Sequence, residues 1–219
     1  MEPTTAQVEA GQAVYTKCLL AVYDVAVLRL LCRCVWRCPS RRIVELYNAH
    51  VSANHLDVGV GTGYFLDRCR FPPGDVRLAL LDLNPNCLEW TARRVARYRP
   101  EIHRANVLEP IRVRTPRFDS VAVTYVLHCL PGTIRSKARV FDNLKALLNE
   151  GGVIFGATVL HGGVERNRLA RTLARHYNAH GVFTNTHDDL DGLRSVLAQH
   201  LSDPKLEAVG CVAIFSGRA

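Results

Sequence analysis

Residues 56–63 read Leu-Asp-Val-Gly-Val-Gly-Thr-Gly, an apolar strand end that runs into three glycines at every second position. An acidic residue, Asp57, stands two positions before the first glycine. Three glycines within five residues cost conformational entropy, but they permit a tight strand-to-helix turn and the close approach of a ligand. The stretch therefore predicts a loop that bends around a small adenosine-bearing cofactor.

The spacing of the glycines indicates which cofactor this is. A dinucleotide-binding loop has the pattern Gly-x-Gly-x-x-Gly, which would place its third glycine at position 64, where this chain has Tyr64. An NAD-dependent oxidoreductase is therefore the least favoured alternative. The observed pattern resembles motif I of the class I (Rossmann-like) S-adenosylmethionine-dependent methyltransferases, in particular the small-molecule type 11 and type 12 groups. The resemblance implies that S-adenosyl-L-methionine is the cofactor and S-adenosyl-L-homocysteine its product. It also implies that the loop residues lie against the methionine part, namely Asp57, Gly59, Gly61, Thr62 and Gly63.

Two further segments complete the predicted cofactor site. An apolar run from Val76 to Leu81 ends in Asp82 and Leu83, and a carboxylate at the end of a second strand can accept both ribose hydroxyl hydrogen bonds. The resemblance assigns Asn106 and Val107 to the adenine pocket, although the family usually has an aspartate where this chain has an asparagine. The alternative is that Asn106 shapes a turn.

The segment 118–132 contains the fourth predicted strand and the residues that follow it. The carboxyl end of this strand lies where an open sheet binds ligands. We assign Thr124 to the cofactor site. In the resembled family, a histidine often lies near the methyl donor here, and His128 fits as a base for the acceptor; the alternative is that it packs the following turn. His161 is a second, weaker candidate, and Cys129 is interpreted as a buried thiol.

The N-terminal part of the chain is predicted to cover the site. Residues 1–12 are interpreted as a flexible tail, followed by a single domain, 13–219, made of a helical lid over 13–50 and a Rossmann-like core over 51–219. The predicted substrate pocket combines side chains of the lid with side chains of the core, although the aromatic ones among them could instead pack helices onto the sheet. These side chains are Tyr15, Tyr23, Trp36, Tyr125, His128 and His161.

From residue 54 onward, apolar runs and helical periodicities alternate, which predicts an α/β fold with a doubly wound, mostly parallel sheet and helices on both faces. The pattern alone supports five or six strands, and the resemblance implies seven, with the last antiparallel. Strands are expected near 54–60, 76–82, 101–106, 118–126 and 152–159, and helices near 63–70, 85–98, 133–148, 164–180 and 188–200, with a closing hairpin or bulged strand over 206–215.

Composition limits the remaining possibilities. The net charge of +8 suggests nucleic acid, but the arginines are scattered along the chain instead of clustered. The longest apolar stretch, 18–36, is interrupted by Asp24, Arg29 and Arg33, which argues against a membrane span. The eight cysteines lack zinc-like pairing, so we expect no metal and a cytoplasmic location with reduced thiols.

The sequence thus predicts methyl transfer to an O, N, S or C nucleophile of a small-molecule acceptor by in-line displacement. A nucleic-acid methyltransferase and a non-catalytic S-adenosylmethionine-binding protein are the alternatives. The oligomeric state stays open, with a homodimer among the options.

Overall fold

A computed structural model describes residues 31–219, in which seven strands form one sheet of order β3-β2-β1-β4-β5-β7-β6. All neighbouring pairs from β3 to β5 are parallel, whereas β7 runs antiparallel to both β5 and β6. The predicted seven-stranded sheet with an antiparallel last strand is therefore confirmed, and the C-terminal segment is a hairpin. The strands are β1 (Asn54–Val58), β2 (Arg77–Asp82), β3 (Glu101–Arg104), β4 (Phe118–Thr124), β5 (Leu148–Val159), β6 (Ser202–Val209) and β7 (Val212–Arg218).

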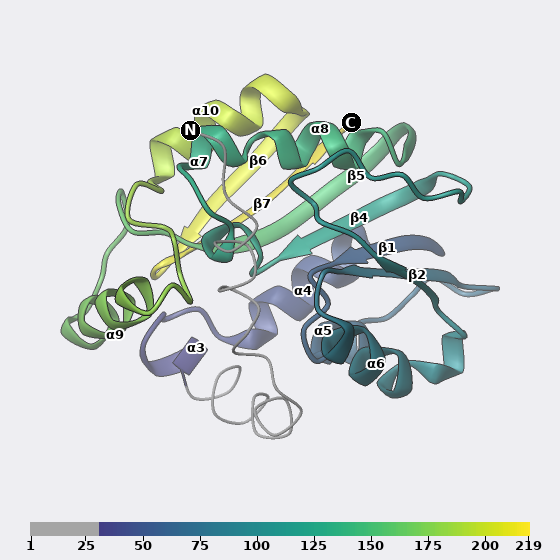
Figure 1. Ribbon diagram of the computed structural model, residues 1–219, viewed down its shortest axis with the longest axis horizontal. Helices are drawn as coiled ribbons and strands as arrows, with labels where there is room; N and C mark the ends of the chain where they lie inside the picture. Colours follow the sequence, from purple (N-terminus) through teal and green to yellow (C-terminus); the bar gives the residue numbers. More distant parts are fainter. Residues whose placement is uncertain (1–30) are drawn as a thin grey trace.

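Helices cover both faces of the sheet (Figure 1). The helices are α3 (Cys32–Cys34), α4 (Ser40–His50), α5 (Tyr64–Arg68), α6 (Pro85–Arg94), α7 (Ile134–Lys137), α8 (Arg139–Lys145), α9 (Arg168–Ala179) and α10 (Leu190–His200), with short 3-10 turns η2 (Ala96–Tyr98) and η3 (Leu127–Cys129). Helices α4, α5, α6 and α9 contribute to one apolar core, and α7, α8 and α10 to a second. Neighbouring residues of β5 belong to different cores, Phe155 to the first and Ile154 to the second, because side chains alternate along a strand.

Side-chain caps set the beginnings of several helices. Asn84 accepts a hydrogen bond from the backbone of Asn86 at the start of α6, and Asn167 caps α9 in the same way through Ala170. Helix α9 therefore begins four residues later than predicted. The helix predicted over 133–148 is two helices separated at Ala138. No glycine or proline marks this break, which explains why the sequence pattern missed it.

The predicted lid, residues 13–50, is described only from residue 31 onward. Residues 1–12 and most of the predicted lid lie outside the described residues, so the lid stays a prediction. Helix α4, which the prediction placed in the lid, packs on the sheet through Ile43 and Tyr47 as part of the first core. Among the helices of residues 31–219, none combines the length and the apolar character needed to cross a membrane.

The parallel strands β1 to β4 end at the same edge of the sheet, and the chain connections reverse direction between β1 and β4. Ligands of open α/β sheets bind at such a topological switch point. The fold therefore places the glycine loop after β1 beside the ends of β2 and β4.

Candidate functional site

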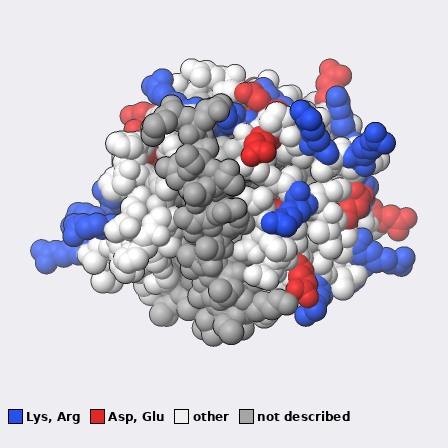
Figure 2. Space-filling model, viewed as in Figure 1, with Lys and Arg blue, Asp and Glu red and all other residues white. Residues whose placement is uncertain are grey.

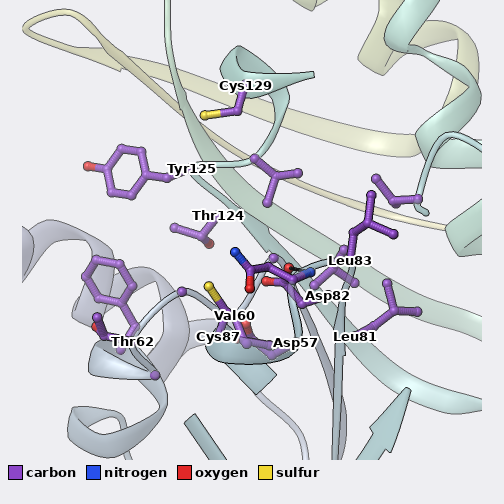
Figure 3. Close-up of a pocket in the computed structure, with 18 of the residues that line it drawn as sticks. Asp57, Val60, Thr62, Leu81, Asp82, Leu83, Cys87, Thr124, Tyr125 and Cys129 are labelled. Carbon is purple, nitrogen blue, oxygen red and sulfur yellow. Dashed lines mark hydrogen bonds between the residues drawn. The ribbon is translucent and has the colours of Figure 1, made fainter. Parts of the chain in front are cut away.

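A cavity opens at this edge of the sheet, over the carboxyl ends of β1, β2, β3 and β4. Figure 3 shows Tyr125 and Cys129 toward one end of the cavity, and Asp82 with Leu83 toward the other. All ten residues predicted to bind the cofactor line it, although their contact with a cofactor stays a prediction. They are Asp57, Gly59, Gly61, Thr62, Gly63, Asp82, Leu83, Asn106, Val107 and Thr124.

Gly59, Gly61 and Gly63 have positive φ angles of 69°, 52° and 70°. The three glycines differ in what lies next to them. A Cβ atom on Gly59 would lie 2.2 Å from Val126, and one on Gly63 would lie 2.7 Å from Thr91. A Cβ atom on Gly61 would meet nothing within 4 Å. Two of the glycines therefore allow the protein to pack closely against itself, while Gly61 keeps the cavity wall open to a ligand.

Helix α6 holds the glycine loop in place through two hydrogen bonds. The Thr91 hydroxyl donates a hydrogen bond of 3.1 Å to the Gly61 carbonyl, and the Arg94 guanidinium donates one of 3.0 Å to the Thr62 carbonyl. Because both carbonyls are tied to the helix, the loop keeps a fixed conformation beside the cavity.

Asp82, at the end of β2, is a carboxylate held by backbone N–H groups. Asn84 donates a hydrogen bond of 2.8 Å to its Oδ1, and the N–H of Gly61 also faces it. Burial raises the pKa of Asp82 to about 6, although these N–H groups favour the charged form and lower it. A carboxylate held in this way can accept hydrogen bonds from ribose hydroxyls, and this role of Asp82 stays a prediction.

Asn106 both lines the cavity and shapes a turn. Its Oδ1 accepts a hydrogen bond of 3.0 Å from the Leu108 backbone, and its amide donates to Glu109. The alternative suggested for Asn106 therefore holds, and the adenine contact stays a prediction for a side chain whose turn already fixes its position. The backbone of Val107 is held by Asn143, whose side-chain amide donates a hydrogen bond to the Val107 carbonyl.

Tyr47 lines the cavity from α4 and was not predicted from the sequence. Its hydroxyl donates a hydrogen bond of 2.7 Å to Asp57 Oδ2. No local pattern could have shown this, because the contact depends on how α4 packs against the sheet. Nearby, the Thr124 hydroxyl is buried and has no hydrogen-bond partner of acceptable geometry among the described residues. An unpartnered hydroxyl beside a carboxylate fits a polar ligand group.

The end of the cavity beyond β4 is mostly apolar and aromatic. Phe65, Tyr125, Val126, Cys129 and Leu130 contribute to its lining. Tyr125 has a φ of 60°, which is unusual for a residue with a side chain, and its N–H donates a hydrogen bond of 2.7 Å to Ala157. Such a conformation costs about 1 to 3 kcal/mol and persists where the surroundings impose it, often at functional sites. Here it turns the chain sharply at the end of β4.

His128 does not line the cavity, and its contacts do not favour the predicted role of a base. Its Nδ1 accepts a hydrogen bond of 3.3 Å from the Val159 backbone, which assigns the proton of the neutral ring to Nε2. Burial, followed by the charge of Lys137, lowers the pKa of His128 to about 3. Its ring packs against Phe183, with centroids 4.4 Å apart. These contacts favour the alternative, a histidine that packs the turn.

The other predicted pocket residues divide into two groups. Tyr15 and Tyr23 lie outside the described residues, so their roles stay predictions. Trp36 and His161 are described, and neither lines the cavity. Trp36 is buried against Phe183, as expected if it only packs. Burial and the charge of a nearby arginine lower the pKa of His161. Within the described chain, no cluster of three or more histidines, cysteines or acids could hold a metal ion.

Comparison with known proteins gives a consistent result. Residues 56–154 match a family model described as a methyltransferase domain. Demethylluteothin O-methyltransferase of Streptomyces thioluteus is 43% identical over 209 residues, covering 95% of this chain and 91% of that protein. The physcion biosynthesis cluster O-methyltransferase of Aspergillus chevalieri is 35% identical over 215 residues, covering 97% and 96%.

A solved structure shows the same fold over nearly the whole length. The complex of DhpI with S-adenosylhomocysteine superposes with a TM-score of 0.69 at 13% identity, covering 99% of this chain and 98% of that one. At this identity the likeness concerns the fold alone.

Proposed function

This chain belongs to the class I S-adenosylmethionine-dependent methyltransferases, and we propose that it transfers the methyl group to a hydroxyl oxygen of a small molecule. The observation that carries the choice of oxygen is the similarity, over almost the full chain, to two proteins named as O-methyltransferases. The cavity described above supports the same reaction.

The cofactor supplies a methyl group that is already activated on a sulfonium. We assign Asp82 to its ribose, Asn106 and Val107 to its adenine, and the loop around Gly61 to its methionine part. These residues follow the order of the strand ends, β3, β2 and β1, across the cavity. What the protein contributes to the rate is the alignment of the acceptor oxygen with the methyl carbon and the exclusion of water.

The acceptor end of the cavity is next to β4. Tyr125, Phe65 and Leu130 form an apolar and partly aromatic wall there, which suits a flat, weakly polar acceptor. Enzymes of this fold that methylate exocyclic amines of nucleic acids have an Asn- or Asp-Pro-Pro-aromatic run at the end of this strand. This chain has Thr124-Tyr125-Val126-Leu127 instead.

The surface charge gives little support to a nucleic-acid acceptor. On the face shown in Figure 2, lysines and arginines gather mainly toward the two sides, and acidic residues lie among them. Several arginines are also engaged in ion pairs, such as Arg77 with Glu101 and Arg97 with Asp67. Binding to phosphates gains from a continuous row of free cations.

The test compares acceptors that differ only in the nucleophilic atom. Purified protein is incubated with S-adenosylmethionine and with 2-naphthol, 2-naphthylamine or 2-naphthalenethiol, beside a panel of larger hydroxylated aromatics and enols. Mass spectrometry of the products identifies the methylated atom. We expect methyl ethers only. Transfer to the amines alone, or incorporation of label into RNA or DNA, would contradict the proposal, and binding of the cofactor without transfer to any acceptor would favour a non-catalytic role.

We include a cytoplasmic location in the proposal. The seven described cysteines are all free thiols, as is usual in reducing compartments. Cell fractionation followed by immunoblotting tests this part, and recovery of the protein outside the cytoplasm would contradict it.

A further inference from the structure

The clearest unexplained feature beside the cavity is the contact between Tyr47 and Asp57. Tyr47 is only 2% exposed, and its hydroxyl donates a hydrogen bond of 2.7 Å to Asp57 Oδ2. Phe65 stacks on its ring with centroids 5.7 Å apart, and Phe155 packs edge-on at 5.1 Å. Burial, followed by the charge of Asp57, raises the pKa of Tyr47 well above its usual range. Tyr47 is therefore a fixed, permanently neutral donor.

The same carboxylate oxygen faces a second buried group. His55 Nε2 lies 3.8 Å from Asp57 Oδ2, and His55 Nδ1 lies 2.8 Å from the Ser120 hydroxyl. Both His55 and Ser120 are fully buried. Thus Oδ2 is turned toward the protein interior, whereas no group among residues 31–219 hydrogen-bonds to Oδ1. Because Asp57 lines the cavity, Oδ1 is the oxygen left for a ligand.

The chemistry of the cavity restricts what this ligand group is. Among the described lining residues, Asp57 and Asp82 are the only carboxylates, and we have assigned Asp82 to the ribose. Asp57 lies one strand further along, at the end of β1, between β2 and β4. The methionine part of the cofactor carries an ammonium group, which pairs favourably with a carboxylate.

A second observation at the same place is the Thr124 hydroxyl. It is 7% exposed, lines the cavity, and has no hydrogen-bond partner of acceptable geometry among the described residues. The Thr124 hydroxyl is close enough to the Tyr47 phenol to lower the pKa of Tyr47, although burial and the charge of Asp57 have larger effects that raise it. A buried hydroxyl without a partner costs free energy, so it is expected to gain one when a ligand binds.

We propose that Tyr47 is a positioning residue: it orients Asp57 so that Oδ1, together with the Thr124 hydroxyl, binds the ammonium group of the methionine part of the cofactor. The inference rests on the family's cofactor and not on the proposed oxygen acceptor. It makes the cofactor site depend on α4, a helix outside the glycine motif.

The test compares two ligands that differ in the proposed contact. S-Adenosylhomocysteine carries the ammonium group, whereas 5'-methylthioadenosine shares the adenine, ribose and thioether but lacks the amino-acid part. Dissociation constants are measured by isothermal titration calorimetry for the wild type, Tyr47→Phe, Asp57→Asn and Thr124→Val. Tyr177→Phe is the matched control, because Tyr177 does not line the cavity and its hydroxyl makes no hydrogen bond among the described residues.

We expect Tyr47→Phe to weaken the binding of S-adenosylhomocysteine by about 5- to 20-fold, and Asp57→Asn to weaken it by about 10- to 100-fold. These effects correspond to the loss of a charge-assisted hydrogen bond. Binding of 5'-methylthioadenosine should change by less than about twofold. The double variant Tyr47→Phe/Asp57→Asn should bind S-adenosylhomocysteine no more weakly than Asp57→Asn alone, because Tyr47 acts through Asp57. The Tyr177→Phe control should match the wild type for both ligands.

Equal weakening of both ligands by Tyr47→Phe, or no weakening of either, would overturn the proposal. If Tyr47→Phe does not fold, Asp57→Asn and Thr124→Val give the same comparison, and equal effects on both ligands would again overturn it. Thr124→Ser should restore the selectivity lost in Thr124→Val. A failure to form methyl ethers would affect the proposed acceptor and leave these binding results unchanged.

Discussion

At the scale of single residues, the two carboxylates of the cavity are held in different ways. Asp57 receives a side-chain hydrogen bond from a buried phenol, whereas Asp82 receives hydrogen bonds from backbone N–H groups. Burial outweighs these N–H groups at Asp82 and raises its pKa to about 6. Asp82 therefore changes its charge just below neutral pH, and two measurements should detect this.

The affinity for S-adenosylhomocysteine should fall as the pH decreases through about 6, because a protonated Asp82 accepts one ribose hydroxyl hydrogen bond less well. Near this pH, binding should release a proton, so the calorimetric enthalpy should depend on the ionisation enthalpy of the buffer. Asp82→Asn should bind more weakly and lose the inflection. An inflection that persists in Asp82→Asn would assign it to another group.

The same carboxylate affects the stability of the ligand-free protein. Since the pKa of Asp82 is raised in the folded state above its usual 3.8, the native protein holds an extra proton between about pH 4 and 6. Its free energy of unfolding should therefore gain a contribution as the pH falls through this window. Comparison of urea unfolding for the wild type and Asp82→Asn at pH 7 and pH 5 isolates that contribution.

His128 should matter for stability more than for proton transfer. In His128→Ala, the Val159 N–H loses its acceptor and a cavity forms beside Phe183, so we expect a loss of about 1 to 4 kcal/mol in unfolding free energy. The pH dependence of kcat/KM between pH 6 and 9 should keep its midpoint. A shifted midpoint together with unchanged stability would show that His128 is the base after all.

At the scale of elements, the glycine loop combines a ligand surface with a packing surface. Gly61→Ala and Gly63→Ala share the strain of a positive φ angle, about 1 to 2 kcal/mol. Only Gly63→Ala adds a contact of 2.7 Å with the Thr91 methyl group of α6, which should cost about 1 to 3 kcal/mol more. We therefore expect Gly63→Ala to lower the unfolding free energy more than Gly61→Ala does. Relative to the stability that each variant loses, Gly61→Ala should lower the affinity for S-adenosylhomocysteine more.

A second-site variant sharpens this prediction. Thr91→Ser removes the colliding methyl group and keeps the hydroxyl that donates to the Gly61 carbonyl. Adding it to Gly63→Ala should restore most of the extra stability lost, whereas adding it to Gly61→Ala should restore none. Equal effects on both backgrounds would refute the assignment of Gly63 to helix packing.

A buried ion pair joins α7 to the segment before α10. Lys137 Nζ lies 2.5 Å from Asp188 Oδ2 and 3.0 Å from the Thr184 carbonyl, and both charged side chains are fully buried. Lys137→Met leaves Asp188 without its partner and should cost about 3 to 5 kcal/mol, while Lys137→Met/Asp188→Leu should recover a large part of this loss. Lys145→Met on α8, in a more exposed pair, is the control, with an expected change below about 1 kcal/mol. Urea unfolding measures all three.

At the scale of the whole molecule, the sequence predicted best what depends on neighbouring residues. The glycine loop, Asp82 and the alternation of strands and helices are local patterns, and they located both the sheet and its ligand-binding edge. Tyr47, the packing of α4 and the tautomer of His128 depend on contacts between segments far apart in sequence. No glycine or proline marks the break between α7 and α8 in the sequence. Periodicity carries no information on such contacts. The cavity lining at the strand ends was therefore predictable, whereas the lining that depends on packing between distant segments was not.

Because the cavity is lined by the ends of four strands and by α4, a ligand that fills it should stabilise the entire domain against unfolding. At a concentration of 100 times its dissociation constant, S-adenosylhomocysteine should raise the unfolding free energy by about 2.7 kcal/mol, measured as a shift of the urea midpoint at constant slope. NAD at the same concentration should produce no shift, because Tyr64 occupies the position where a dinucleotide loop needs its third glycine. Stabilisation by NAD, or none by S-adenosylhomocysteine, would contradict the assignment of this cavity to the methyl donor.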